Sequence, residues 1–231
     1  MSTVGIVCEY NPFHKGHLYQ IEQAKKLTEA DHVVCFMSGN FLQRGIPALA
    51  DKFTRAEAAI KCGVDVIFEI PFVYSTSSAR DYATAAVTMM DMSGAIDFIS
   101  FGAETDDLVL LSQIADIVEN EPPQVSDSIR RSVASGMTYG AARATAIEDY
   151  LQKKDIVRNN PSNSSSSVSK SNISSVMSSP NNILAIEYLA ALKRIKSKIK
   201  PVIIKRIISN YNSNEACLLY TSPSPRDRQK S

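Results

Sequence analysis

The sequence predicts an α/β fold: a Rossmann-like parallel sheet with helices on both faces, followed by a partial helical region. Three observations predict it. Short apolar runs of strand length alternate with segments of helical periodicity over the first 150 residues. Breaker residues such as Asn11-Pro12 and Ser38-Gly39-Asn40 end the apolar runs. The composition, with 44% hydrophobic and 21% charged residues, is that of an ordinary globular protein with a real core.

The elements follow one another in a regular order. Strands are predicted at residues 4–8, 32–37, 64–70 and 98–101, and helices at residues 18–27, 52–62, 79–92, 108–119 and 183–195. In the first helix Leu18, Ile21, Ala24 and Leu27 recur at a spacing of three, and Gly63 is placed to end the second helix. In such a fold, ligands bind beyond the carboxyl ends of the strands, near the point where the strand order reverses.

Charge, cysteine content and hydropathy exclude several classes of protein. The 25 Lys and Arg residues balance the 24 Asp and Glu residues to a formal charge of +1, which excludes binding of nucleic acid chiefly by charge but not a locally basic face. The cysteines lack any CxxC spacing, so neither a zinc site nor a disulfide framework is predicted. No apolar stretch approaches the roughly 20 residues that cross a bilayer, and Met1–Val7 lacks a signal-peptide layout. We expect a cytoplasmic protein that does not contact membranes.

Composition also divides the chain into parts. Residues 1–150 are expected to form the main domain. Residues 151–179 are expected to be a flexible loop, because 11 of the 18 residues from Ser162 to Ser179 are serine. Residues 180–215 return to a helical pattern. Residues 216–231 show no periodicity and resemble the translation of a transposase adapter used in sequencing libraries, so we expect a non-native tail there.

The candidate site is the HxGH motif from His14 to His17, between the first strand and the first helix. Free N–H groups and the helix dipole favour an anion there, and Gly16 allows close backbone approach. Both imidazoles can donate hydrogen bonds to a phosphate whose charge grows during displacement. Chance clustering of histidines at a polar turn is the alternative, which the placement after Cys8–Phe13 disfavours. A metal site is a weaker alternative, because no cysteine, third histidine or acidic run accompanies the motif.

Longer blocks carry a more specific resemblance. Residues Gly5–Tyr19, GIVCEYNPFHKGHLY, are similar to the N-terminal signature of the tRNA-Met cytidine acetate ligase family, which belongs to the HxGH nucleotidyltransferase superfamily. Further matching blocks are Met37–Gly45, Asp65–Pro71, Phe101–Gly102 and Pro180–Leu184. Together they cover residues 1–213 apart from the serine-rich loop.

The resemblance implies a nucleotidyltransferase fold and a two-step reaction. ATP and acetate would form acetyl-adenylate with release of pyrophosphate. The acetyl group would then pass to the exocyclic amine of the wobble cytidine in elongator tRNA-Met, giving N4-acetylcytidine. Mg²⁺ is expected with the nucleotide, although the sequence shows no dedicated cage. Acetate follows from the resemblance alone.

The resemblance also implies roles for individual residues. His14 and His17 would be catalytic and hold the phosphates, and Gly102 would admit the adenosine closely. The implied ATP-binding positions are Val7, Cys8, Glu9, Tyr10, Asn11, Pro12, Phe13, His14, Lys15, Gly16, His17, Leu18, Tyr19, Gln20, Gly102, Asn181, Asn182, Arg206 and Ile207.

Several polar and charged residues near the second and third strands have two interpretations. Gln43, Arg44, Lys52 and Arg55 could reach phosphate or RNA, or could form a solvated loop and helix face. Glu69, in an apolar strand, either caps the strand's end or pairs with a base, since burying it unpaired would be costly.

The remaining candidates are also open to a structural interpretation. Asp106 and Asp107 could bind a metal, but an N-cap for the helix from Leu108 is favoured. The basic run from Lys193 to Arg206 could touch tRNA phosphates, yet a charged helix face explains most of it. Tyr10 either stacks on a base or packs in the core.

The chain departs from the family pattern in ways that limit the expected activity. Ala185 stands where the family usually carries Gly, and Arg206–Tyr211 is a loose match to a stretch containing Gly and Ser. The family continues through a second nucleotide motif and a C-terminal region for tRNA that are not found here. We therefore expect an incomplete enzyme that has much of the nucleotide pocket and poor or no full acetylation activity. The alternatives are an adenylyl- or cytidylyltransferase of cofactor biosynthesis and a non-catalytic nucleotide- or RNA-binding module. Oligomeric state is not predicted.

Overall fold

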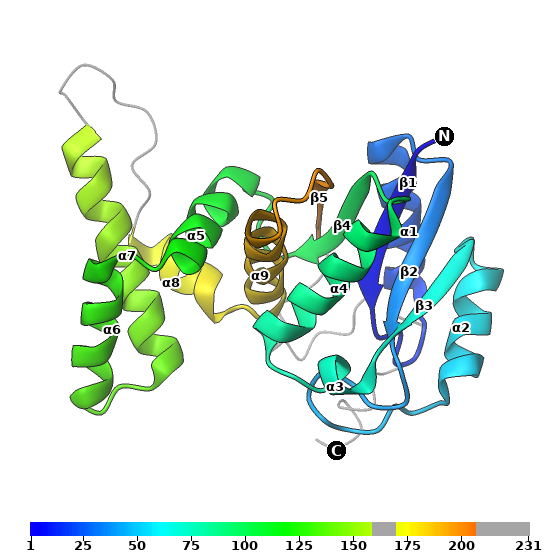
Figure 1. The fold of residues 1–231 in the computed structure, drawn as a ribbon, viewed down its shortest axis with the longest axis horizontal. Coiled ribbons are helices and arrows are strands. Elements are labelled where there is room, and N and C mark those ends of the chain that lie inside the picture. The colour runs from blue at the N-terminus through cyan, green and yellow to red at the C-terminus, as the bar shows by residue number, and fades with distance from the viewer. Residues whose placement is uncertain (159–169, 207–231) are drawn as a thin grey trace.

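A five-stranded, fully parallel sheet lies at the centre of the molecule (Figure 1), in a computed structural model that describes residues 1–158 and 170–206. Its strands are β1 (Thr3–Cys8), β2 (His32–Ser38), β3 (Val66–Ile70), β4 (Phe98–Ala103) and β5 (Lys200–Lys205). The order is β3-β2-β1-β4-β5, so the chain winds outward from β1 in both directions and the order reverses between β1 and β4. The expected α/β class is confirmed, because every adjacent pair of strands is parallel.

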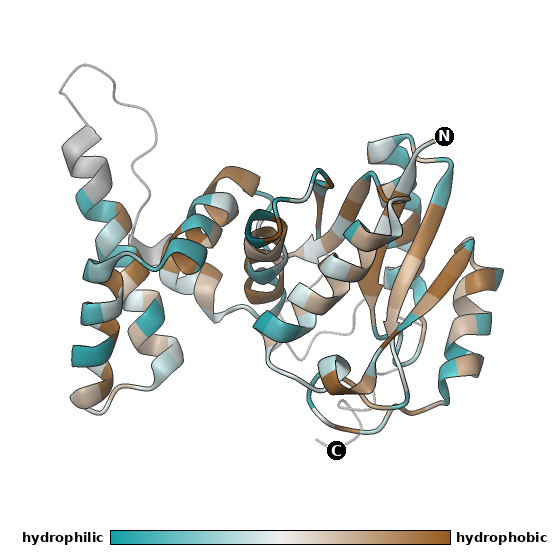
Figure 2. Ribbon diagram, in the orientation of Figure 1, coloured by the Kyte–Doolittle hydropathy of each residue, from teal (hydrophilic) through white to brown (hydrophobic). Residues whose placement is uncertain are grey.

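Helices cover both faces of this sheet. They are α1 (Lys15–Thr28), α2 (Lys52–Lys61), α3 (Phe72–Ser75), α4 (Ala79–Ser93), α5 (Leu108–Asn120), α6 (Pro123–Ala134), α7 (Tyr139–Arg158), α8 (Lys170–Ser178) and α9 (Pro180–Arg194). Apolar residues are concentrated on the strands (Figure 2). Figure 1 shows α6, α7 and α8 beyond α5 and α9, on the side away from the sheet.

Alternation along the strands divides the core into two clusters. Ile6 of β1 and Cys35 of β2 face α1 and α2, where Ile21 and Ala59 complete one cluster. Phe36 and Ile99 point to the opposite face and pack with residues of α4, α5 and α9. Successive side chains of a strand point to opposite faces, and burying a large aliphatic side chain stabilises a fold by about 1.5–3 kcal/mol. Both faces of the central strands therefore need apolar residues, which explains the apolar runs in the sequence.

The expected flexible loop at 151–179 is wrong at both ends. α7 continues to Arg158 and α8 spans Lys170–Ser178. The serine content of α8 conceals an apolar face, because Ile173, Val176 and Met177 recur at helical spacing and join the core on the α9 side of the sheet. Residues 159–169 lie outside the described part of the chain.

The basic run from Lys193 to Arg206 is not one helix face. α9 ends at Arg194, and the chain then re-enters the sheet as β5, in which Pro201–Ile204 are flanked by Lys200 and Lys205. Lysines at both ends are common on edge strands because they discourage pairing with a further strand. Because of these lysines, the sequence pattern did not predict a fifth strand. β5 pairs with β4 from Phe98↔Lys200 to Ala103↔Lys205.

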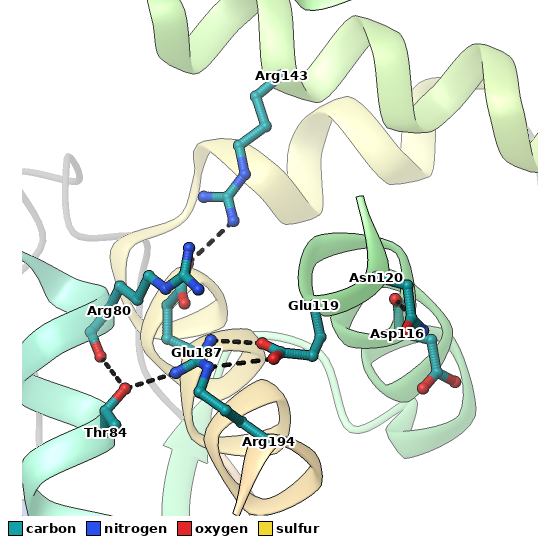
Figure 3. Close-up of polar contacts among 8 residues, drawn as sticks. All are labelled: Arg80, Thr84, Asp116, Glu119, Asn120, Arg143, Glu187 and Arg194. Atoms are coloured by element: carbon teal, nitrogen blue, oxygen red, sulfur yellow. Dashed lines mark hydrogen bonds and ion pairs between the residues drawn. The ribbon is translucent and has the colours of Figure 1, made fainter. Parts of the chain in front are cut away.

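Ion pairs join α9 to its neighbours (Figure 3). Arg194 donates from Nε to Glu119 Oε1 (3.2 Å) and from Nη1 to Thr84 Oγ1 (2.6 Å), and so joins α9 to α5 and α4. Arg143 on α7 donates to the buried Glu187 at 3.1 Å. Planar guanidinium–carboxylate pairs fix orientation as well as distance, so α9 is held in one position above the sheet. Within residues 1–158 and 170–206, every helix is too short or too polar to cross a lipid bilayer.

Candidate nucleotide site

The candidate site begins where β1 leads into α1. His14 is the N-cap of α1, and its Nδ1 accepts a hydrogen bond from the Gly16 amide (3.1 Å), while His17 Nδ1 accepts from the His14 amide (3.3 Å). The two imidazole rings stack with their centroids 3.5 Å apart. A ring nitrogen that accepts an amide hydrogen bond carries no proton, so in each neutral ring the N–H is at Nε2. Both histidines therefore offer Nε2–H as their hydrogen-bond donor.

The two rings are neutral at neutral pH. Burial lowers the pKa of His14 to about 4, with the charge of Arg206 as the second cause. Burial, and then the charges of His14 and Arg206, also lower the pKa of His17 well below its ordinary value. Positive charge at this site therefore comes from Arg206 and from the N-terminal end of α1 rather than from the imidazoles.

Arg206 and Gly102 lie next to each other at the ends of β5 and β4. A Cβ on Gly102 would lie 3.7 Å from Arg206 Cγ and 3.9 Å from the Ile204 carbonyl oxygen, so the arginine side chain passes beside the glycine. Gly102 lies on β4, whose first half pairs with β1, and Arg206 directly follows β5. The fold thus brings four of the sequence-predicted residues, His14, His17, Gly102 and Arg206, to the carboxyl ends of three adjacent strands.

The two asparagines at the start of α9 hold the chain that follows β4. Asn182 is buried, and its side-chain oxygen accepts hydrogen bonds from the Glu104 amide (2.9 Å) and the Thr105 amide (3.2 Å). In return, the Glu104 carboxylate accepts from Asn181 Nδ2 (2.6 Å) and from the Asn182 amide (3.0 Å). These contacts fix the loop beside Gly102. Glu104 was missed by sequence analysis, and no local pattern links it to residues more than 75 positions away.

Most residues of the segment from Val7 to Gln20 are buried or partly buried. Tyr10 packs in the core, with 1% of its surface exposed, its hydroxyl 3.2 Å from Cys35 Sγ and its ring 4.8 Å from the His17 ring. Burial raises the pKa of Tyr10 and of the neighbouring Cys8. Pro12 and Lys15 are exposed, whereas the partly buried members of this segment are Val7, Glu9, Asn11, Phe13, His14, Gly16, His17, Leu18, Tyr19 and Gln20. Ile207 lies outside the described residues.

The loop after β2 lies at the same end of the sheet. The Gln43 amide donates to Glu9 Oε1 (2.8 Å), and its side chain donates to the Ser77 carbonyl (3.0 Å). Lys52 forms an ion pair with Glu69, which confirms that Glu69 pairs with a base. Arg44 is exposed on this loop.

Arg55 neither reaches outward to phosphate or RNA nor lies on a solvated helix face. Only 2% of its surface is exposed, and its guanidinium donates to four main-chain carbonyls, those of Glu9, Ser38, Gly39 and Ala50. Burial lowers the pKa of Arg55. The side chain joins the ends of β1 and β2 to the loop that precedes α2. Sequence alone could not show this, because main-chain acceptors leave no residue signature.

The two aspartates before α5 have structural partners. Asp107 Oδ1 accepts from the Leu110 amide (2.9 Å), so the favoured N-cap interpretation is confirmed, and Asp106 pairs with Lys205 at 3.2 Å. The described residues hold no grouping of three or more histidine, cysteine, aspartate or glutamate side chains placed to bind a metal ion.

The geometry of the His14–His17 site agrees with the protein family whose model matches this chain. The model of the HIGH Nucleotidyl Transferase family matches residues 1–224. This chain belongs to the HIGH nucleotidyl transferase family. The His14–His17 tetrapeptide at the start of α1 is the position at which the chain carries the family's HxGH-type motif.

Among curated proteins, this nucleotidyl transferase chain is similar to two tRNA(Met) cytidine acetate ligases. The Caldanaerobacter subterraneus subsp. tengcongensis protein is 44% identical over 213 residues, which is 92% of this chain and 49% of that protein. The Acetivibrio thermocellus protein is 41% identical over 213 residues, which is 92% of this chain and 48% of that protein. The resemblance seen in the sequence is confirmed. The chain spans about half the length of these relatives.

Solved structures show the same fold. The chain superposes on Thermotoga maritima TmcAL bound with alpha-thio ATP with a TM-score of 0.81 and 34% identity, covering 92% of this chain and 48% of that one. The apo form of the same protein gives a TM-score of 0.84 at 33% identity, with 94% and 48% coverage.

Proposed function

We propose that this chain binds ATP and activates acetate as acetyl-adenylate, whose acetyl group then passes to the wobble cytidine of elongator tRNA-Met to give N4-acetylcytidine. The single observation that carries the proposal is the stacked His14–His17 pair at the N-terminus of α1, whose pKa values burial and the charge of Arg206 lower and whose donors are at Nε2. The relatives named as tRNA(Met) cytidine acetate ligases, and the TmcAL structure bound with alpha-thio ATP, support the choice of substrates.

The first step needs little covalent chemistry from the protein. A carboxylate oxygen of acetate attacks the α-phosphorus of ATP, and the bond to the β-phosphate oxygen breaks, so that pyrophosphate leaves with the electron pair. His14 and His17 donate Nε2–H hydrogen bonds to the phosphate oxygens on which negative charge grows, and Arg206 neutralises part of that charge. Because neutral imidazoles need no change of protonation, this donor set is already in place before the nucleotide arrives.

Gly102 gives the nucleotide close access to the backbone at the end of β4. Its lack of a side chain leaves open the space beside Arg206, where the adenosine part would lie. Mg²⁺ would arrive with the phosphates of ATP, because the described residues provide no cage of their own for it. We assign no step to the metal. With this role we also propose a cytoplasmic location.

Acetate-dependent exchange of pyrophosphate into ATP tests the first step. We expect exchange with acetate, and none when nicotinamide mononucleotide or phosphopantetheine replaces it. His14→Ala and His17→Ala should each lower the exchange rate by about 100-fold, as removal of one oxyanion donor does in other enzymes. The matched control is His32→Ala, because His32 begins β2 at the opposite end of the sheet.

Each alternative has its own outcome. Pyrophosphate release that depends on nicotinamide mononucleotide or phosphopantetheine would replace acetate activation with small-molecule nucleotidyl transfer. ATP binding without any turnover would leave a non-catalytic nucleotide-binding module. Unchanged exchange in both histidine variants would refute the phosphate role of the pair. Incorporation of labelled acetate into tRNA-Met, with a transcript lacking the wobble cytidine as control, tests the second step.

A further inference from the structure

One carboxylate at the end of β1, that of Glu9, forms no ion pair with any of the described residues. Glu9 directly follows β1, and its Oε1 accepts a hydrogen bond from the Gln43 amide (2.8 Å). Its main-chain carbonyl accepts from the buried Arg55 guanidinium. Among the described residues, no lysine, arginine or histidine forms an ion pair with the Glu9 carboxylate, and its Oε2 accepts no hydrogen bond. The carboxylate is thus held in place at one oxygen and leaves the other for a ligand.

The Glu9 charge acts on two buried tyrosines, Tyr82 of α4 and Tyr188 of α9. Burial and then the Glu9 charge raise the pKa of Tyr82, and burial, Tyr82 and Glu9 raise the pKa of Tyr188. Both tyrosines belong to the core cluster that packs against α4 and α9. The Tyr82 hydroxyl lies 3.4 Å from Ser38 Oγ at the end of β2. The charge near Glu9 on this side is the buried Arg55 guanidinium, which donates to the Glu9 carbonyl and not to its carboxylate.

Glu9 is one of the ATP-binding positions that the resemblance implies, but its carboxylate is tied to the loop after β2. Its Oε1 accepts from the Gln43 amide on that loop, whereas Gly102 and Arg206, beside which we propose that the adenosine lies, are at the ends of β4 and β5. The same loop carries Phe41, whose ring meets that of Phe72 at 5.4 Å, and both rings are exposed, by 42% and 60%. Exposed aromatic rings are the surfaces on which unpaired RNA bases stack. An acceptor base would therefore enter on the Glu9 side.

We propose that Glu9 is the general base of acetyl transfer, accepting the proton that the cytosine exocyclic amine loses as it attacks the acetyl carbon. The inference rests on the proposed function. The amine nitrogen forms a bond to the acetyl carbon, the bond from that carbon to the phosphate oxygen breaks, and AMP leaves with the electron pair. The amine proton passes to Glu9 Oε2 and then to water. An exocyclic amine of cytosine is a weak nucleophile because its lone pair is delocalised into the ring, so a positioned carboxylate has most effect at this step.

The test separates the two half-reactions. Hydroxylamine traps acetyl-adenylate as acetohydroxamate and needs no protein base, because it is a strong nucleophile in its neutral form. Acetyl transfer is measured with an anticodon stem–loop of tRNA-Met. Glu9→Gln keeps an oxygen that can accept from the Gln43 amide and removes only the basicity. We expect Glu9→Gln to lower the rate of acetyl transfer by at least about 100-fold more than it lowers the rate of hydroxamate formation. The matched control is Glu57→Gln, an exposed carboxylate of α2 that pairs with Lys61.

Every result decides between the two proposals. Equal transfer by wild type and Glu9→Gln overturns the role of Glu9 and leaves acetate activation intact. Equal losses of hydroxamate and transfer show that Glu9 belongs to the ATP-binding machinery, and this also overturns the base assignment. A wild-type chain that forms hydroxamate but acetylates no cytidine refutes the assignment for this chain. A wild-type chain that forms no hydroxamate refutes the proposed function itself, and the assignment with it.

Discussion

Arg55→Met should destabilise the whole carboxyl edge of the sheet. The guanidinium contacts the carbonyls of Glu9, Ser38, Gly39 and Ala50, and the Ser38 and Gly39 residues are themselves buried. A buried polar group that loses its partner costs about 1–3 kcal/mol, so these two carbonyls alone account for about 2–6 kcal/mol. Arg55→Met recovers part of this free-energy cost, because a charge no longer has to be buried. We expect a net loss of about 2–4 kcal/mol, which is large beside the roughly 5–15 kcal/mol of a typical fold.

Urea unfolding followed by circular dichroism measures this loss, and ATP titration measures its effect on the site. Arg55→Lys should lose less stability than Arg55→Met, because an ammonium group still donates to some of the carbonyls. It should remain less stable than wild type, because it reaches fewer of the four than a planar guanidinium does. The control is Arg130→Met on α6, where the arginine is 80% exposed and its ion pair with Asp127 is 3.6 Å long. ATP affinity should fall in Arg55→Met, since the Glu9 carbonyl loses its anchor. An unfolding free energy within about 0.5 kcal/mol of wild type would refute the reasoning, because that is the range of neutral surface substitutions.

Three further predictions address the site. Gly102→Ala should leave the unfolding free energy within about 0.5 kcal/mol of wild type, because the new Cβ meets only ordinary contacts at 3.7 and 3.9 Å. It should nevertheless raise the Kd for ATP about tenfold, because the added methyl group occupies space beside the nucleotide. Calorimetric titration measures the Kd, and an unchanged affinity would remove Gly102 from the adenosine site. Asn182→Ala should lower the unfolding free energy by about 2–4 kcal/mol, because two amides lose their acceptor; a urea-derived loss below about 1 kcal/mol would contradict it. Because the pKa of His14 falls from 6.5 to about 4 on folding, the unfolded chain binds more protons between these values, and stability should drop as pH falls from 6.5 to 4. After allowance for solvent screening, His14 should contribute about 1–2 kcal/mol of this drop, and equal pH dependence in wild type and His14→Gln would be contrary to expectation.

The sequence predicted the fold wherever an element had a clear period. The four strands from β1 to β4 and five of the helices were found within a few residues, because each has an apolar face that the sheet requires. β5 was missed because lysines begin and end it, and α8 because serines occupy its solvent side while Ile173 and Val176 enter the core. α6 and α7 were also not singled out. In each case, tertiary packing supplied the signal that local composition obscured.

The site was predictable only for residues that carry a motif. His14, His17 and Gly102 stand at strand ends in the sequence, and topology requires those ends to meet at one edge of a parallel sheet. Contacts through the main chain left no such trace. Arg55 holds carbonyls, Asn182 holds amides, and Glu9 is held by the Gln43 amide, so none of these partners is specified by its side-chain type.

The electrostatics of the site make the HxGH motif insufficient by itself. Both imidazoles are neutral, so the motif supplies two hydrogen-bond donors and a helix N-terminus but no full positive charge. The full charge comes from Arg206, and it reaches the histidines only because β5 pairs with β4 and directs the chain over Gly102. A substitution that unpairs β5 should therefore weaken nucleotide binding even though it leaves His14 and His17 untouched. Anion binding in this fold is accordingly a property of the sheet order, which sets β5 next to β4, as much as of the motif.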